Sequence, residues 1–334
     1  MRELNTMKIG ITYDLRSDYL AMGFSEDETA EFDRDDTILA INNTLLKLGH
    51  ETERIGHIKQ LAAALVVGKR WDLVFNIAEG MYGIGREAQV PALLDAYCIP
   101  YTFSDPLVMS LTLDKGMTKR VLRDAGVPTS DFLVASSGDD AARVHFAPPY
   151  FIKPVAEGTG KGITAASIVR DKKKLAAGVA ELVKTYRQPV LIEPYLPGRE
   201  FTVGIVGTGG EAKAIGSMEV ILLSNAEQGV YSYVNKENCE ELVEYRLALA
   251  DDEPLVAEAE RIALDAWQVL GCRDAGRIDI RCDGNNRPQF MEVNPLAGIH
   301  PEHSDLPIIC TKMSIPYQQL IRDIVDSAAS RITR

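Results

Sequence analysis

The chain has 334 residues, of which 46% are hydrophobic and 25% charged, values typical of a folded globular protein. Its formal net charge of −12 argues against a nucleic-acid partner, because phosphate backbones are bound by basic surfaces. No apolar run approaches the roughly 20 residues that a membrane-spanning helix needs, so no membrane partner is expected. At about 100–150 residues per domain, the length predicts two or three domains.

The cysteines predict a reducing compartment. There are five, an odd number, and none forms a C-x-x-C pair of the kind that holds zinc or exchanges disulfides. The first residues also lack the apolar core of a signal peptide. We therefore expect reduced, mostly buried thiols and a cytoplasmic protein.

Residues 1–111 form the first expected domain. Apolar strands are predicted at residues 7–13 and 71–77, with a helix of amphipathic spacing at 36–48 between them. Alternation of strand and helix over about 105 residues indicates a parallel, doubly wound α/β layer. Residues 15–33 are polar, acidic and without periodicity, and a loop of this length is often functional.

Two further units are expected, at residues 112–197 and 198–334. The elements predicted for the second unit are a helix at 115–125, strands at 150–154 and 163–169, a helix at 172–186 and a strand at 189–196. The third unit contains a long irregular segment at 222–241, a helix at 255–270 and then a hairpin. No internal repeat or low-complexity tract is evident.

A glycine-rich loop in the second unit is a candidate phosphate site. The stretch IKPVAEGTGKGI, residues 152–163, carries three alternating glycines between Lys153 and Lys161. It is not a Walker A loop, because Lys161 is followed by Gly162 rather than by serine or threonine. Nor is it a dinucleotide fingerprint, because the residues after Gly162 are predicted as a strand and not as a helix. A flap that closes over phosphate is therefore expected, with a plain surface turn as the alternative.

The hairpin of the third unit, residues 275–298, is predicted to turn at Asp-Gly-Asn-Asn, residues 283–286. The cross-strand pairs that follow are Cys282 with Arg287, Asp279 with Phe290 and Arg277 with Glu292. Side chains alternate between the faces of a strand. One face then carries Arg277, Asp279, Glu292 and Asn294, and the other carries Ile278, Ile280, Met291 and Val293.

The polar face of this hairpin predicts a metal site. Asp279, Glu292 and Asn294 offer the hard oxygen ligands that Mg²⁺ prefers when it also holds phosphate. The alternative is a solvated surface pair between arginine and carboxylate. The sequence EVNPLAG, which continues into proline and glycine instead of a polar tail, favours the metal site, as does the phosphate-loop candidate upstream.

Together, the Lys-Pro strand with its glycine flap, the stretch IEPYLPGREFTV and the hairpin GRIDI…MEVNP resemble the ATP-grasp superfamily, and within it the D-alanine–D-alanine ligase group. The resemblance implies a three-domain α/β ATP-grasp fold with an N-terminal, doubly wound pre-ATP-grasp domain. It also implies an ADP-forming ligase that joins an amino-acid carboxylate to an amine through an acyl phosphate. ATP and Mg²⁺, with Mn²⁺ as an alternative metal, small-molecule amino-acid substrates and a homodimer are implied as well.

The resemblance assigns the nucleotide site residue by residue. Lys115, Lys153 and Lys236 would reach the phosphates, the last from a mobile lid at 222–241. Glu193 and Leu196 would bind adenine through backbone groups, and Glu200 would bind the ribose. The residues that match the family's flap are Glu157, Gly158, Thr159 and Gly160, with the Thr159 hydroxyl helping to order the closed site.

The same resemblance assigns the reaction centre. Asp279, Glu292 and Asn294 match the Mg²⁺ ligands. Arg277 and the Gly298 amide match the pair that stabilises the tetrahedral oxyanion.

The amino-acid pockets depart from the family pattern. Glu79 stands where the family has histidine, with Arg86 nearby, and Glu237 follows Lys236 where the family has tyrosine. Glu31 is a displaced match for the glutamate that holds the donor ammonium. Ser304 is a candidate partner for the acceptor carboxylate, after one extra residue.

We therefore expect a ligase of this type with altered amino-acid pockets. A literal D-alanine–D-alanine ligase is one alternative, and a ligase for other amino acids or for a dipeptide-like natural product is another. A non-catalytic ATP-binding subunit is the alternative from a different class. The presence of Arg277 beside the three metal-ligand candidates counts against it, because a degenerate subunit has no need of an oxyanion arginine.

Overall fold

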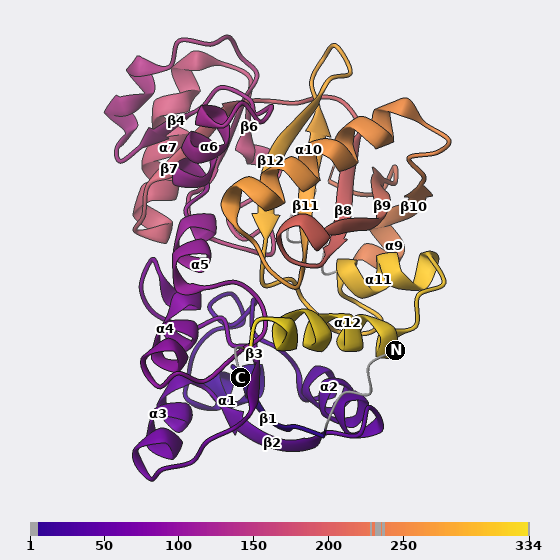
Figure 1. The fold of residues 1–334 in the computed structure, drawn as a ribbon. Coiled ribbons are helices and arrows are strands. Elements are labelled where there is room, and N and C mark those ends of the chain that lie inside the picture. Colours follow the sequence, from indigo (N-terminus) through magenta and orange to yellow (C-terminus); the bar gives the residue numbers. More distant parts are fainter. Residues whose placement is uncertain (1–5, 228, 231–234, 236–237, 333–334) are drawn as a thin grey trace.

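The computed structural model describes residues 6–227, 229–230, 235 and 238–332, and its strands form three sheets. Figure 1 shows the elements of the first sheet at the bottom, those of the second at the upper left and those of the third at the upper right. The strand orders are β2-β1-β3, β4-β7-β5-β6 and β10-β9-β8-β11-β12. Each sheet lies within one of the expected domain ranges, whose boundaries stay predictions.

The first sheet is parallel and covered on both faces. Its strands and helices are β1 (Lys8–Tyr13), α2 (Asp35–Lys47), β2 (Glu51–Gly56), α3 (Ile58–Val66), β3 (Leu73–Ile77) and α4 (Gln89–Ala96). Leu73 and Phe75 point to a core shared with α2, whereas Val74 between them packs into a second core with α3 and α4. This alternation along a fully buried strand confirms the doubly wound layer.

The polar segment 15–33 contains a short helix, α1 (Arg16–Ala21), where the sequence predicts no regular structure. Long-range contacts stabilise it rather than periodicity. The Tyr19 ring packs against Phe32 with ring centroids 4.5 Å apart, and the Arg16 amide donates to the Asp33 carbonyl at 2.9 Å. A six-residue helix presents too few turns for a periodic pattern, so tertiary packing decides its conformation.

The second sheet is antiparallel and carries the glycine flap. Its unit comprises α5 (Pro106–Leu113), α6 (Lys115–Asp124), β4 (Leu133–Ala135), η2 (Gly138–Arg143), β5 (Tyr150–Pro154), β6 (Ile168–Val169), α7 (Lys172–Tyr186) and β7 (Val190–Pro194). The strand predicted at 163–169 is wrong over its first five residues. A 3-10 turn, η3 (Ala165–Ser167), replaces it, because the Thr164 hydroxyl accepts from the Ala166 amide at 3.2 Å.

The third sheet and its helices complete the chain. They are β8 (Glu200–Val206), η4 (Gly209–Glu211), β9 (Lys213–Leu222), α9 (Cys239–Leu242), β10 (Val243–Ala248), α10 (Pro254–Leu270), β11 (Ala275–Cys282), β12 (Pro288–Asn294), α11 (Asp305–Lys312) and α12 (Tyr317–Ser330). Helix α10 packs Trp267 against Ile278 and Phe290 of the sheet. Helix α12 lies between this sheet and the first domain, in whose core Ile321 is buried (Figure 1).

The register of the β11–β12 hairpin differs from the predicted one. The observed pairs are Cys282 with Pro288, Asp279 with Glu292 and Arg277 with Asn294. A bulge between Asp279 and Ile280 leaves Met291 without a partner, so the residues beyond it shift by one further position. The predicted polar face is confirmed. Met291, which was expected on the apolar face, lines the cleft instead, and Phe290 occupies the core in its place.

Among the residues that the structure describes, no helix is long and apolar enough to cross a membrane. The cysteines whose side chains are described, namely Cys98, Cys272, Cys282 and Cys310, are all free thiols, and all but Cys98 are buried.

Asp274 joins the first and third domains. Its fully buried carboxylate accepts from the Phe103 amide at 2.7 Å and from the Ser327 hydroxyl at 2.7 Å. Arg331 forms an ion pair with it and also donates to the Tyr101 carbonyl at 3.2 Å. One carboxylate therefore connects the end of the first domain, the start of β11 and the end of α12.

We predict that Asp274→Ala lowers the free energy of unfolding by about 3–5 kcal/mol, because it leaves the Arg331 guanidinium without its buried partner. Urea unfolding followed by circular dichroism measures this, with the exposed Asp252→Ala as the matched control. Equal stability of the two variants would contradict this role of Asp274.

Candidate active site

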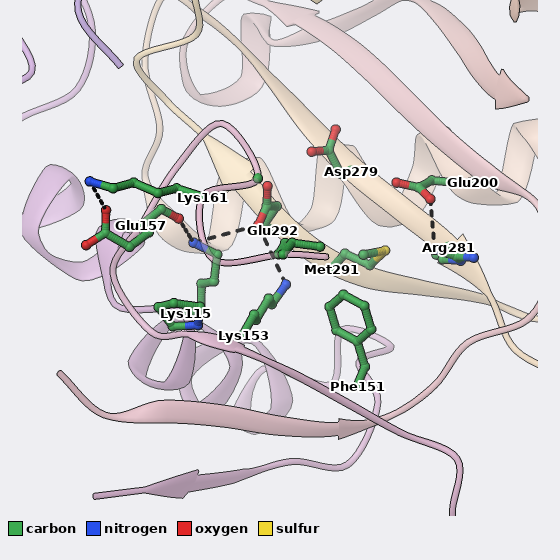
Figure 2. A pocket seen from close by; sticks show the side chains of 13 residues that line it. Lys115, Phe151, Lys153, Glu157, Lys161, Glu200, Asp279, Arg281, Met291 and Glu292 are labelled. Atoms are coloured by element: carbon green, nitrogen blue, oxygen red, sulfur yellow. Dashed lines mark hydrogen bonds and ion pairs between the residues drawn. The ribbon is translucent and has the colours of Figure 1, made fainter. Parts of the chain in front are cut away.

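A cleft lies between the glycine flap and the β11–β12 hairpin. Figure 2 shows side chains from α6, β5 and the flap on one wall, opposite side chains from β8, β11 and β12. The lining residues are Lys115, Phe151, Lys153, Pro154, Glu157, Gly160, Lys161, Ile163, Glu200, Asp279, Arg281, Met291 and Glu292. The structure therefore brings together seven of the residues that the sequence assigns to nucleotide and metal.

Glu292 faces two lysines across this cleft. Its Oε2 lies 3.7 Å from Lys115 Nζ and 3.6 Å from Lys153 Nζ (Figure 2). Burial lowers the pKa of Lys115, and the Glu292 charge offsets this only in part. Burial acts on Lys153 in the same direction, but Glu193 and Glu292 outweigh it and raise its pKa. Lys153 is thus a fixed cation inside the cleft.

Glu193 stabilises the positive charge of Lys153. Its Oε2 lies 3.7 Å from Lys153 Nζ, and its other oxygen pairs with Lys119, whose side chain is fully buried. Burial acts to raise the pKa of Glu193, but the two lysines outweigh this and lower it. The expected contact of Glu193 with adenine through the backbone stays a prediction. So does that of Leu196, which lies beyond β7 and is not among the lining residues.

The polar face of the hairpin is preorganised by hydrogen bonds. Asp279 accepts from the Thr202 hydroxyl at 3.0 Å and forms an ion pair with Arg277. Arg277 Nε also lies 3.4 Å from Asp305 Oδ2. Burial acts to lower the pKa of Arg277, but the charges of Asp279 and Asp305 outweigh this effect and raise that pKa above its usual value.

A divalent metal fits this face. Asp279 and Glu292 are cross-strand neighbours, and Asn294 continues the same row. The buried amide nitrogen of Asn294 has no hydrogen-bond partner among the described residues, so that side chain can turn its oxygen to a ligand. No cluster of three or more His, Cys, Asp or Glu suited to a metal occurs in the described parts of the chain. Two carboxylates and an amide are instead the donors for a metal that keeps phosphate oxygens as further ligands.

The reaction-centre candidate Gly298 and the acceptor-site candidate Ser304 lie near Arg277. Ser304 precedes α11, and its hydroxyl accepts a hydrogen bond from the His300 amide at 2.9 Å. A Cβ at Gly298 would lie 2.7 Å from that hydroxyl, so only glycine allows the two residues to approach. Because Arg277 contacts Asp305, the structure places Gly298, Ser304 and Arg277 around one end of the hairpin.

Glu200 lines the cleft, but an arginine already contacts it. Arg281 Nη1 lies 3.0 Å from Glu200 Oε2 (Figure 2). Arg281 also donates to the Tyr195 hydroxyl at 3.3 Å. The carboxylate is therefore held in one orientation at the edge of the site. Its expected contact with ribose stays a prediction.

Three candidates for the amino-acid pockets, Glu31, Glu79 and Arg86, belong to the first domain. Glu31 pairs with Arg86 at 2.8 Å, and both are largely buried. No hydrogen bond or ion pair connects Glu79 to another residue within the described ranges. Burial, together with the charges of Glu87 and Glu31, raises the pKa of Glu79 well above its usual value. Lys236 and Glu237 lie outside the described residues.

Sequence reasoning missed two cations of the site. Lys119 is four residues beyond Lys115, and this helical spacing puts both on one face of α6. Arg281 continues the alternation of Arg277 and Asp279 along β11, so the period of two identified its face as well. Neither signal showed that these side chains are buried, which depends on how α6 and β11 pack.

Comparisons with known proteins agree with this arrangement. A family model described as "D-ala D-ala ligase C-terminus" matches residues 121–326. D-alanine–D-alanine ligases from Bordetella petrii and Aquifex aeolicus are 33% and 31% identical, over 82% and 86% of this chain and 80% and 92% of their own. A D-alanine–D-alanine ligase from Bacillus anthracis, crystallised with ATP, has a TM-score of 0.72 and 22% identity, covering 97% of this chain and 98% of its own.

The three sheets, with flap and hairpin on opposite walls of one cleft, define a three-domain ATP-grasp fold. The site carries the charges of an ATP-dependent ligase. Within that class, the chain belongs to the D-alanine–D-alanine ligase family. The family and fold expected from the motifs are thereby confirmed.

The carboxylates beside Arg86 make a pH dependence testable. Burial and the Glu31 charge raise the pKa of Glu87 to about 7, although Arg86 opposes them. The folded protein then holds a proton that the unfolded chain releases near pH 4.3, so this contribution to stability falls as pH rises from about 4 to 7. We predict that Glu87→Gln gains thermal stability relative to the parent between pH 5 and 8.

Melting temperatures of both proteins across that range measure the difference, with the exposed Glu258→Gln as control. A difference that does not change with pH would show that Glu87 titrates normally.

Proposed function

We propose that the protein is an ADP-forming ligase that joins the carboxylate of one amino acid to the amine of another. The observation that carries this proposal is the position of Glu292, opposite Lys115 and Lys153 and beside Asp279. Two buried cations facing two carboxylates suit a polyphosphate that arrives with a divalent metal. The family and the ligases that it resembles support the same reaction class.

The reaction needs activation, because a carboxylate is a poor electrophile. A carboxylate oxygen of the donor attacks the γ-phosphorus of ATP, ADP leaves, and an acyl phosphate forms. The amine of the acceptor then attacks the carbonyl carbon, loses a proton and expels phosphate. Lys115 and Lys153 offset the repulsion between carboxylate and triphosphate, and Arg277 with the Gly298 amide stabilises the oxyanion.

Asp279, Glu292 and Asn294 would hold Mg²⁺, or Mn²⁺, which when bound neutralises phosphate charge and orients the transferred group. Amino acids and ATP are the proposed small-molecule ligands. A homodimer, a cytoplasmic location and the absence of nucleic-acid and membrane partners are proposed from the family and from the acidic charge.

A substrate pair other than two D-alanines is favoured by the environment of Glu79. Arg86, the cation available to neutralise it, pairs with Glu31 instead. Glu79 and Glu87 are therefore two carboxylates without a paired cation among the residues described, in a region where burial raises the pKa of both. An acceptor with an additional amine or donor-rich side chain would supply the missing partner. A literal D-alanine–D-alanine ligase is the second candidate, supported by the names of the relatives.

We predict that Lys153→Met and Glu292→Gln each lower kcat by at least about 100-fold, because each removes charge stabilisation of the transition state. ADP release with ATP, Mg²⁺ and all pairs of D- and L-amino acids is the assay. Lys173→Met, an exposed lysine on α7, is the control. Near-normal ADP release by either cleft variant would contradict the proposed function.

We further predict that two D-alanines are a poor pair for the parent, and that Glu79→His combined with Glu237→Tyr shifts preference toward them. The physical reason is that both changes replace a carboxylate by the side chain that the family uses. Ratios of kcat/KM for two D-alanines and for the best pair measure the shift. If the parent makes D-alanyl-D-alanine as its best product, the second candidate is correct.

A further inference from the structure

Two hydrogen bonds join the first domain to the glycine flap, and an ion pair within the first domain connects the residues that make them. Arg86 Nη1 donates to the Ala156 carbonyl at 3.0 Å, and Arg86 Nη2 donates to Glu31 Oε2 at 2.8 Å. The other oxygen of Glu31 accepts from the Gly158 amide at 2.6 Å. The ion pair thus holds two backbone groups of the flap, one on each side of Glu157, although Glu31 and Arg86 are 55 residues apart in the sequence.

The surroundings of the Arg86–Glu31 ion pair strengthen its contacts with the flap. Only 11% of the Arg86 side chain and 13% of the Glu31 side chain are exposed. Charge-assisted hydrogen bonds are stronger than neutral ones, and limited exposure reduces their screening by solvent. A Cβ at Gly158 would lie 2.9 Å from Glu31 Oε1, so a larger residue there would push the Glu31 carboxylate away from its present position.

The flap itself is strained. Thr159 has a φ of +48°, in the left-handed region that a β-branched residue rarely adopts. Its buried hydroxyl has no hydrogen-bond partner in the described part of the chain. Strain of this kind persists only where the surroundings fix the backbone. The contacts from Glu31 and Arg86 reach the residues immediately before Thr159 and supply that constraint.

The flap is also connected to the phosphate side of the cleft. Lys115 Nζ donates to the Glu157 carbonyl at 2.6 Å, and Gln188 holds the Ala156 amide at 2.7 Å. Successive flap residues are therefore held from the first domain, from α6 and from the loop after α7. Arg86 differs from the other two anchors because it bridges a separate domain.

We propose that Arg86 is a positioning residue which, through its ion pair with Glu31, fixes the glycine flap over the cleft and keeps water from the activated substrate. This proposal rests on the proposed ligase function. When the flap opens, water adds to the acyl carbonyl, phosphate leaves and the carboxylate is regenerated. ATP is then hydrolysed without a peptide bond being formed.

Hydrogen exchange of the nucleotide-free protein tests the positioning role without any catalysis. For Arg86→Ala, amides of residues 156–162 should exchange about tenfold faster or more, because local opening becomes easier. Amides of β5 should be unchanged. Arg86→Lys, which keeps the charge but not both hydrogen bonds, should fall between parent and Arg86→Ala. Arg54→Ala, which removes a more exposed ion pair of the first domain with Asp35, away from the flap, should match the parent.

Unchanged exchange in folded Arg86→Ala would overturn the positioning role. If Arg86→Ala does not fold, the comparison is made with Arg86→Lys and Glu31→Gln, and parent-like exchange in both overturns it equally.

Coupling tests the water-excluding role. With the amino-acid pair that gives the parent its highest ADP release, the ratio of ADP to peptide bonds formed should be near one for the parent. It should rise severalfold for Arg86→Ala. A ratio that stays near one while kcat falls would contradict water exclusion. If no pair supports ADP release by the parent, the ligase function fails, whereas the exchange result still decides the role of Arg86.

Discussion

The approach of Glu292 to Lys115 and Lys153 is the interaction on which the rest of the site depends. The three groups come from two different sheets and a helix, and each lysine Nζ lies within 3.7 Å of the same carboxylate oxygen. Buried lysines without anionic neighbours would lose their protons. Glu292 keeps positive charge in the cleft when no phosphate is present, and a metal–triphosphate can replace that contact without a change in the fold.

Charge is distributed unequally over the two halves of the site. On the nucleotide side, cations and carboxylates alternate: Lys119 pairs with Glu193, Glu193 lies near Lys153, and Lys153 faces Glu292. On the amino-acid side, carboxylates exceed cations, and Arg86 is shared between Glu31 and the flap. The alternating charges of the first half suit a metal–polyphosphate. We propose that the second half, with its excess of carboxylates, determines the substrates of this chain.

The sequence predicted the site better than it predicted the details that build it. The row of Arg277, Asp279, Glu292 and Asn294 was recoverable, because the observed pairs at this end of the hairpin differ from the predicted ones by two positions, which leaves each side chain on its predicted face. The pairing register was not recoverable, because the bulge at Met291 depends on side-chain packing, which the alternation along each strand does not reveal. Lys119 was missed for a related reason, since its burial beside Glu193 of β7 depends on how the helix and the strand meet in space. The 3-10 turn at 165–167 and helix α1 were missed because short elements carry little periodicity.

The most direct test of the central claim follows the oxygen of the donor carboxylate. An amino-acid donor labelled with ¹⁸O in its carboxylate is turned over with ATP, Mg²⁺ and the acceptor that gives the highest ADP release. Because activation passes through an acyl phosphate, one labelled oxygen should appear in the released phosphate and none in ADP. Label in AMP, or phosphate without label while the peptide forms, would contradict activation by phosphoryl transfer in this cleft.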